Sequence, residues 1–413
     1  MNFSFVSQYP LFRLGLLAAA VSLSACSDND RLPGDGHDHD HEESSGRLAF
    51  GEDGSNRVHV LDLEDGAILG SFELSHPVSA LYASPGGRYA VVAQSAGGKL
   101  AFIDGGVWQH GDHAHADDPV KLALERTGIK PAHYRAHEDQ AAMFYDGEGE
   151  TAARFDLITD ASLAAGSIVA SQTLLGPVHG IAEPRDGYVL AVNQARTQVV
   201  PYELHGDHFH EEAAFATLCE GLHGGSSNED YSAFGCNDGV LVVQQTESGF
   251  EDFKIATPKR VTQVAGHHAV EWFAGFASDG TLYVIDPVAK TATELDWDGD
   301  AGATTARSQH LIDAHGEHLA ILDTVGALHV ISLADWTRKG GMQAVEGIGS
   351  GAAGARLASS GAEDLLFVTD PVARAIVAID LEHIEEAGHY DLDFTPVGLA
   401  WLGIAAESDE HEH

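Results

Sequence analysis

One short strand-like segment recurs along almost the whole chain, and it constrains the fold more than any other feature. Its copies are rich in β-branched residues, are alternating or continuously apolar, and are separated by Asp/Gly turns. Helical periodicity is nearly absent between them. The eight copies begin at Arg57, Lys99, Ala152, Gln198, Val240, Thr281, Ala327 and Ala375.

The copies are spaced by about 45 residues, and a period of 40 to 50 residues holding four strands is typical of a β-propeller. Most copies are preceded by a second strand, as at Tyr89–Ala93, Tyr188–Val192 and Leu365–Thr369. Eight such units fill residues 46 to 405. We therefore predict an all-β chain with eight four-stranded blades. Seven blades, without the irregular copy at Ala152, is the alternative.

The two ends of the repeat region complement each other. Arg47–Phe50 has the pattern of a second strand with no innermost strand before it, and Thr395–Ile404 is one strand too many after the last copy. If the C-terminal strand completes the first blade, the ring has no free edge strand to promote aggregation. We predict this closure.

The N-terminal segment has the pattern of a targeting signal. Leu11–Ala25 is apolar but too short to span a bilayer as a stable helix. It leads into Leu-Ser-Ala-Cys, which resembles the bacterial lipobox, so we expect Cys26 to be lipidated. Ser27 after the cysteine resembles outer-membrane lipoproteins. Ordinary signal cleavage beside an incidental cysteine is the alternative.

These features divide the chain into four parts. A lipoprotein signal peptide (1–25) is followed by a flexible His/Asp-rich tether (26–46), the propeller domain (47–405) and an acidic, His-containing tail (406–413). In an oxidising compartment, Cys219 and Cys236 are expected to form a disulfide worth about 3 kcal/mol in the chain-entropy model. A metal-binding role for this pair is the alternative.

Composition limits the partners. With 63 acidic against 22 basic residues, the formal charge is −41, which disfavours nucleic acid and anionic membrane surfaces. The membrane is then reached only through the N-terminal lipid, and we expect a monomer. Twenty-five histidines raise the expectation of transition-metal binding, since imidazole is a common ligand of such ions.

The predicted blade order places many histidines on one face of the ring, because the first-to-second and third-to-fourth strand connections share a face. The motif His-Gly-Asp-His-x-His occurs in two such connections, at His110–His115 and His205–His210. His137 and Asp139 lie in a first-to-second strand turn. Both chain ends leave at this face, the N-terminal one carrying His37, His39 and His41.

Zinc takes three or four nitrogen, oxygen or sulfur ligands, so these loops are chemically sufficient. The primary predicted zinc ligands are His110, His113, His115, His137 and Asp139. The tail histidines are either a flexible metal-capture segment or a solvated tail, and His205–His210 is either a metal loop or a solvated one. The inner-strand histidines are either secondary metal ligands or structural caps near the axis; these are His133, His179 and His223.

The sequence has no G-x-S-x-G, P-loop, CxxCH or HExxH motif, and no ring of Glu, Asn and Asp at strand starts suits a hard metal. We therefore expect a binding protein rather than an enzyme. A metal-dependent propeller hydrolase or lactonase, and a metal-independent interaction scaffold, are the alternatives.

The signal, the tether, the HGDHAH loop followed by PAHYRAHED, and the CEGLHG…FGC region together resemble AztD-type periplasmic zinc metallochaperones. The resemblance implies a propeller that binds Zn²⁺ and passes it to the substrate-binding protein of a zinc ABC importer. It also implies zinc ligation by His113 and His115 with His137 and Asp139. For the tether histidines it implies capture or delivery.

Overall fold

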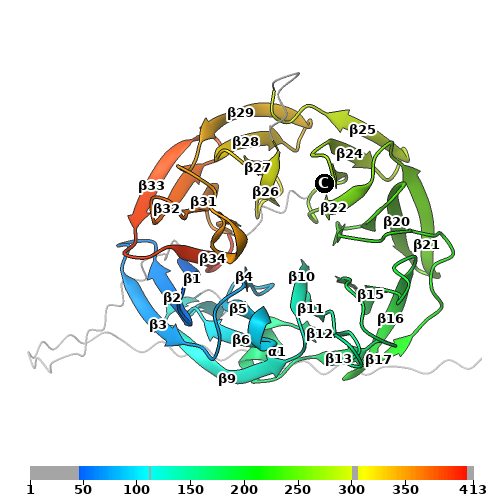
Figure 1. Cartoon of the computed structure of the whole chain (residues 1–413), viewed down its shortest axis with the longest axis horizontal. Helices are drawn as coiled ribbons and strands as arrows, with labels where there is room; N and C mark the ends of the chain where they lie inside the picture. The colour runs from blue at the N-terminus through cyan, green and yellow to red at the C-terminus, as the bar shows by residue number, and fades with distance from the viewer. Residues whose placement is uncertain (1–45, 111–112, 300–305, 407–413) are drawn as a thin grey trace, which may run out of the picture. The chain divides into compact units, whose positions relative to one another are not determined.

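The computed structural model describes residues 46–110, 113–299 and 306–406, with the side chains of His110 and His113 left out. Within these residues, eight four-stranded antiparallel sheets surround a common centre (Figure 1), which confirms the eight-bladed propeller. Cys26, His37, His39, His41 and most of the C-terminal tail lie outside the described residues.

The strands are numbered along the chain, and blades are numbered from the one that holds β1. From the innermost strand outward, blade 1 consists of β34 (Pro396–Leu402), β1 (Arg47–Glu52), β2 (Arg57–Asp62) and β3 (Ile68–Glu73), and blade 2 of β4 (Ala80–Ala83), β5 (Tyr89–Gln94), β6 (Lys99–Asp104) and β9 (Val120–Thr127). Blade 3 consists of β10 (Pro131–His137), β11 (Gln140–Tyr145), β12 (Arg154–Ile158) and β13 (Ala170–Thr173), and blade 4 of β14 (Ala182–Arg185), β15 (Tyr188–Val192), β16 (Val199–His205) and β17 (His208–Glu211).

The remaining blades follow the same order. Blade 5 consists of β18 (Gly225–Ser227), β19 (Tyr231–Cys236), β20 (Gly239–Thr246) and β21 (Gly249–Ala256), and blade 6 of β22 (Val261–Ala265), β23 (Phe273–Ala277), β24 (Leu282–Asp286) and β25 (Thr291–Leu295). Blade 7 consists of β26 (Arg307–Ile312), β27 (His318–Asp323), β28 (Ala327–Ser332) and β29 (Thr337–Gln343), and blade 8 of β30 (Leu357–Ser359), β31 (Leu365–Asp370), β32 (Ala375–Asp380) and β33 (Glu385–Asp391). A two-stranded hairpin, β7 (Val107–His110) and β8 (His113–Ala116), is inserted between β6 and β9.

The ring closes as the sequence predicted. β34 from the C-terminal region pairs antiparallel with β1, with Arg47 opposite Leu402 and Leu48 opposite Trp401. Blade 1 is thereby completed by strands from both ends of the chain. The pairing satisfies the edge of β1 that an open ring would leave unpaired.

The copy at Ala152 is irregular for a local reason. Its strand, β12, starts at Arg154 and is followed by α1 (Asp160–Ala164) before the outer strand β13. Thr159 caps α1, since its side-chain oxygen accepts a hydrogen bond from the backbone N–H of Ser162 and the Ser162 hydroxyl accepts one from Thr159 N–H. The inserted turn lengthens this blade without removing a strand.

The core lies between blades, which explains the apolar runs. Every residue of β5 is buried, because its two faces pack against neighbouring blades. Burying a Val or Leu side chain contributes about 1.5–3 kcal/mol, so the apolar clusters between the blades stabilise the ring. No helix among the described residues is long and apolar enough to cross a membrane.

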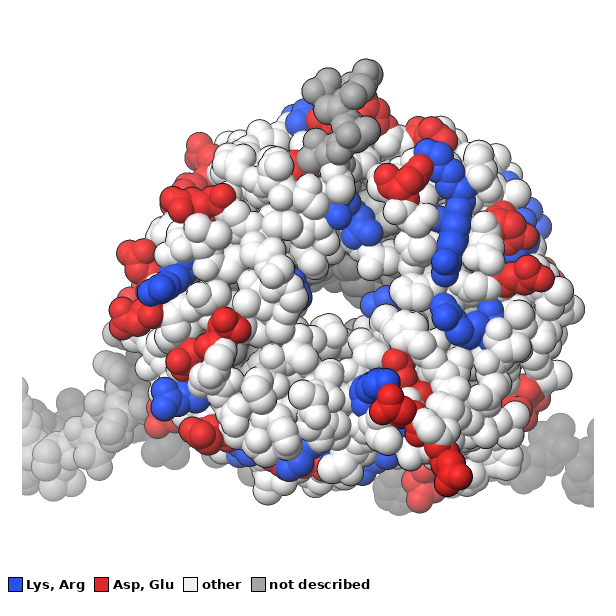
Figure 2. All heavy atoms as spheres, in the orientation of Figure 1, with Lys and Arg blue, Asp and Glu red and all other residues white. Residues whose placement is uncertain are grey.

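Figure 2 shows that the ring is hollowed at its centre and that acidic side chains on the visible face are distributed around it rather than gathered in one patch. The inner strands therefore border a central opening. The side chains at their ends decide what that opening can bind.

Candidate metal centre

Three histidines from three consecutive blades converge near the axis. His133 lies on the inner strand β10, whereas His179 and His223 shortly precede the inner strands β14 and β18. The Nε2 atom of His179 lies 3.2 Å from Nε2 of His133 and 3.4 Å from Nε2 of His223. Each offers one ligand atom within 4.8 Å of the others. We call these residues the axial triad.

Glycines let the blades approach closely enough for this convergence. A Cβ atom on Gly180 would clash with Val192 of the same blade and would lie 3.3 Å from Cζ of Phe144 in blade 3. Gly224 has a φ of +72°, and a Cβ there would lie 2.6 Å from the carbonyl oxygen of Thr262. The His-Gly pairs in the sequence thus place an imidazole where the following residue has no room for a side chain.

Hydrogen bonds fix the tautomers of two triad members. Nδ1 of His179 lies 2.8 Å from Oδ2 of Asp146, and Nδ1 of His223 lies 2.9 Å from the carbonyl oxygen of Thr262. An ionised carboxylate and a carbonyl oxygen only accept hydrogen bonds, so each Nδ1 donates. In the neutral ring, the proton is then on Nδ1 and Nε2 presents a lone pair.

The two lone pairs therefore face each other, which is unfavourable unless a cation lies between them. Two of the three rings do not supply this cation by binding a proton at neutral pH. Burial, followed by the charges of Arg135 and of the other two triad histidines, lowers the pKa of His133 to about 3. The pKa of His223 is also lowered, chiefly by burial. These two rings are neutral and available to a metal ion.

The distances suit a metal with nitrogen ligands. Two imidazoles bound about 2.0–2.1 Å from a tetrahedral ion have their nitrogens about 3.4 Å apart. The observed separations of 3.2 and 3.4 Å match this value. The bonds from Nδ1 to a carboxylate and a carbonyl are the arrangement that usually orients metal-ligating histidines. Three ligands leave one coordination position open.

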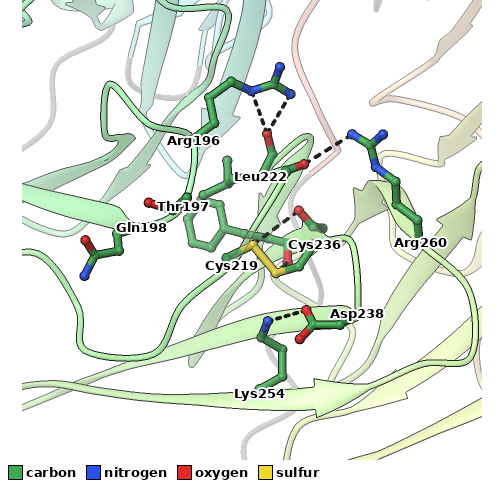
Figure 3. Close-up of a disulfide and its surroundings, with 12 residues drawn as sticks. Arg196, Thr197, Gln198, Cys219, Leu222, Cys236, Asp238, Lys254 and Arg260 are labelled. Atoms are coloured by element: carbon green, nitrogen blue, oxygen red, sulfur yellow. Dashed lines mark hydrogen bonds and ion pairs between the residues drawn. A yellow bond between two sulfur atoms is a disulfide. The ribbon is translucent and has the colours of Figure 1, made fainter.

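The disulfide stabilises the loop that carries His223 (Figure 3). Cys219 and Cys236 are bonded, which confirms the predicted pairing. Arg196 donates to the carbonyl oxygen of Leu222 at 3.0 Å, and Arg260 donates to that of Gly221 at 3.2 Å. His223 itself donates its backbone N–H to Gly235. The imidazole is thus held by a fixed backbone.

The primary predicted ligands are arranged differently. His137 ends β10, four residues from His133, so the two Cα atoms are about 13 Å apart along an extended strand. They cannot share an ion. His137 is only 8% exposed, and burial, then Arg185 and His268, lower its pKa to about 4.

Asp139 is exposed in the turn after β10, and the half-buried ring of His115 stacks on Trp108 at 4.3 Å between centroids. Among the residues whose side chains are described, His115, His137 and Asp139 do not form a group of convergent ligand atoms. Because the side chains of His110 and His113 are outside the description, this primary ligand set stays a prediction. The convergent group is the one the sequence ranked second.

Sequence reasoning missed the residues that orient the triad. Asp146 lies after β11 in blade 3, yet it holds His179 at the start of blade 4. The carbonyl group of Thr262 comes from β22 of blade 6 and holds His223 of blade 5. A signal for Asp146 existed, since an Asp-Gly turn ends the second strand of a blade beside the next inner strand.

Comparisons with known proteins agree with this architecture. No protein-family model matches the chain. The zinc chaperone AztD of Citrobacter koseri is 23% identical over 399 residues, covering 91% of each chain. A solved structure of apo AztD from the same organism superposes with a TM-score of 0.73 at 21% identity, covering 87% of this chain and 98% of that one.

A more distant structure, the dihydro-heme d1 dehydrogenase NirN in complex with DHE, gives a TM-score of 0.58 at 14% identity over 87% of this chain and 75% of that one. At such identities, the superpositions establish the fold. Together with the full-length sequence match, they confirm that this chain is an eight-bladed β-propeller that resembles AztD.

Proposed function

We propose that the chain is a zinc-binding metallochaperone that holds Zn²⁺ on His133, His179 and His223 and passes it to the substrate-binding protein of a zinc ABC importer. One observation carries the proposal: Nε2 of His179 and Nε2 of His223 face each other at 3.4 Å while both Nδ1 atoms donate elsewhere. The similar protein from Citrobacter koseri is named a zinc chaperone, which supports zinc as the cargo.

The geometry favours transfer over permanent storage. Three nitrogen ligands leave a fourth position for water or for a ligand from the acceptor. His179 is exposed, so an incoming imidazole or carboxylate can reach the ion from the solvent side. Zinc can then move through a state in which both proteins share it. Such ligand exchange is not available to a sealed four-ligand site.

Burial also protects one of the zinc ligands from acid. Protons compete with zinc for imidazole nitrogen, and an ordinary histidine starts to bind protons as the pH falls through about 6.5. Because the pKa of His133 is lowered to about 3, this ligand stays unprotonated under mildly acidic conditions. We expect the axial triad to retain zinc at pH 5.5 better than free imidazole does.

The remaining sequence predictions complete the proposal. Zinc ligation by the HGDHAH hairpin with His137 and Asp139 is kept as a separate prediction beside the axial triad, and the tether histidines act in capture or delivery of zinc. Lipidation of Cys26 anchors the protein in the outer membrane, facing the periplasm. The charge of −41 raises the local concentration of divalent cations and favours a basic docking patch on the acceptor.

Zinc titration of the full metal-free chain against a competing chelator tests the central claim. We expect one tight site in the wild type, lost in His179→Ala and in His223→Ala. His389→Asn is the matched control, because it removes an exposed imidazole on the outer strand β33 next to Glu386 and Asp391. Unchanged tight binding in both triad variants would refute the ligand assignment.

Transfer requires a second measurement. Zinc-loaded protein is mixed with the metal-free acceptor, and both are separated and analysed for metal. We expect zinc to reach the acceptor faster than it is released in a control without acceptor, in which a chelator captures the released zinc. Equal rates would mean that zinc is released to solution and that the chain does not transfer it directly.

A further inference from the structure

A second cluster of imidazoles lies at the outer edge of blade 4, far along the sheet from the inner strands. It is formed by the hairpin of β16 and β17 (Figure 1), whose tip residue Gly206 has a φ of +67°. In the strand register, His205 is opposite His208, and Glu203 is opposite His210.

This register places all four side chains on one face. Directly opposite residues share a face of an antiparallel pair, and so do residues two apart on one strand. Phe209, between the two histidines of β17, points the other way and is buried against Phe155 at 5.1 Å between ring centroids. Packing of Phe209 into the core therefore fixes which face the histidines occupy.

The imidazoles are in mutual contact. The ring centroid of His210 lies 4.4 Å from that of His205 and 5.0 Å from that of His208. Nε2 of His208 lies 3.1 Å from Nε2 of His210. This separation is close to the distance of about 3.4 Å between two nitrogens bound to one tetrahedral ion.

Neighbouring carboxylates orient two of the rings. Nδ1 of His208 lies 3.2 Å from Oδ1 of Asp207, and Nε2 of His205 lies 2.8 Å from Oε2 of Glu203. Since a carboxylate accepts, each of these nitrogens donates, and the opposite ring nitrogen is left with a lone pair. His208 then offers Nε2 and His205 offers Nδ1. In the apo form, His210 can donate Nε2–H to His208; metal binding moves that proton to Nδ1.

We infer that this outer hairpin, defined by Glu203, His205, His208 and His210, is a second binding site for a divalent transition metal ion such as Zn²⁺. His208 and His210 are the primary ligands, His205 adds a third nitrogen after a side-chain rotation, and Glu203 orients His205. The inference rests on the proposed function for the identity of the cargo. It does not depend on the axial triad for its geometry.

The site is built for capture rather than retention. Its histidine side chains are open to solvent, with relative exposures of 48% for His205 and 61% for His208. An ion bound there keeps water ligands and exchanges rapidly, whereas the axial triad sits at the inner strands. A weaker outer site that loads from solution suits a protein whose central site delivers its metal.

Residue-level chemical modification tests the outer hairpin directly. Full-length metal-free protein is treated with an imidazole-acylating reagent with and without Zn²⁺, and modification is quantified by peptide mass spectrometry. We expect Zn²⁺ to protect His205 and His208 at least several-fold. His210→Asn should abolish the protection of both, while His389, an exposed histidine beside carboxylates on β33, should show none in either protein.

Zinc stoichiometry gives an independent readout. The double variant His208→Asn, His210→Asn should bind one fewer equivalent of Zn²⁺ and keep the tight site, whereas the triad variant His179→Ala should lose the tight site and keep hairpin protection. If Zn²⁺ does not protect His205 and His208 in the wild type although His179→Ala loses the tight site, the inference on the second site is overturned. If the hairpin is protected but His179→Ala keeps the tight site, the proposed function is overturned. If Zn²⁺ leaves hairpin modification and stoichiometry unchanged, the cluster is a solvated loop.

Discussion

The two copies of His-Gly-Asp-His-x-His occupy equivalent places in blades 2 and 4 but have different surroundings. In blade 4, the motif joins the outer strands of the blade itself, whereas in blade 2 it forms a separate hairpin, β7–β8, between β6 and β9. Glu203 pairs with the last histidine in blade 4. Trp108 holds the same register position in blade 2, and its indole stacks on His115.

The difference shows how a strand partner sets the chemistry of a repeated motif. Glu203 lies opposite His210 and accepts an imidazole N–H from His205 on its own strand, so a carboxylate joins the set of nitrogen donors. An indole offers only an N–H donor, and in blade 2 this N–H bonds to Asp117 at 3.0 Å. The guanidinium of Arg88 also lies 4.9 Å from the Trp108 ring. The position that holds the carboxylate of Glu203 in blade 4 therefore holds the indole of Trp108 in blade 2, on which His115 stacks.

The largest expected effect comes from removing the axial triad, because it tests whether either hairpin can replace it. In the triple variant His133→Ala, His179→Ala, His223→Ala, chelator competition should show that tight zinc binding is lost while weak binding continues. If a site of wild-type affinity persists, a hairpin or the tether holds the tightly bound zinc, and the axial triad is not the tight site.

Removing the disulfide should separate the triad from the hairpins. In Cys219→Ser, Cys236→Ser, the free energy of unfolding should fall by about 3 kcal/mol, measured by urea denaturation. Zinc affinity at the triad should fall as well, since His223 lies within the loop that the disulfide closes, whereas protection of His205 and His208 from acylation should be retained. A parallel loss at both places would point to general unfolding.

Exchanging Glu203 and Trp108 tests whether the residue opposite the last histidine controls zinc binding at each hairpin. Glu203→Trp should weaken zinc binding at the blade 4 hairpin by about 10–100-fold, the usual cost of removing a group that orients a metal ligand. Glu203→Gln is the control, since it keeps the size and an accepting oxygen but not the charge. Trp108→Glu should raise zinc protection of His115. If neither exchange changes protection, the strand partner has no influence on either hairpin.

The smallest effect is expected from acid. His310 lies on the inner strand β26 and is half-buried; Nη1 of Arg307 lies 2.8 Å from its Nδ1, and burial, then Arg307 and Arg135, lower its pKa well below 6.5. The unfolded chain binds a proton that the folded chain does not, so stability is lost as the pH falls below about 6.5.

His310→Gln keeps an acceptor for Arg307 but does not titrate. Its urea midpoint should therefore fall less between pH 7.5 and 5.5 than that of the wild type. Equal falls in both proteins would assign the acid sensitivity to other histidines such as His267, a half-buried residue whose pKa is lowered to about 4, chiefly by desolvation.

Much of the architecture could be predicted from the strand repeat. A period of about 45 residues set the number of blades, and the unpaired strands at the two ends set the closure between β1 and β34. The cysteine pair gave the disulfide. The irregular copy at Ala152 was harder, because the capped turn α1 interrupts the blade without changing its strand count.

The strand repeat, the closure and the abundance of imidazoles could be predicted from the sequence, because they depend on local periodicity and composition. Which imidazoles lie in contact depends on how the blades are arranged around the axis. His133, His179 and His223 are about 45 residues apart, and their nitrogens converge because equivalent inner strands are neighbours around the axis. The tautomers that turn their lone pairs inward come from Asp146 and Thr262, contributed by other blades. The sequence placed these three histidines near the axis as secondary ligands, but the hydrogen bonds that orient them join residues of different blades and required the folded ring.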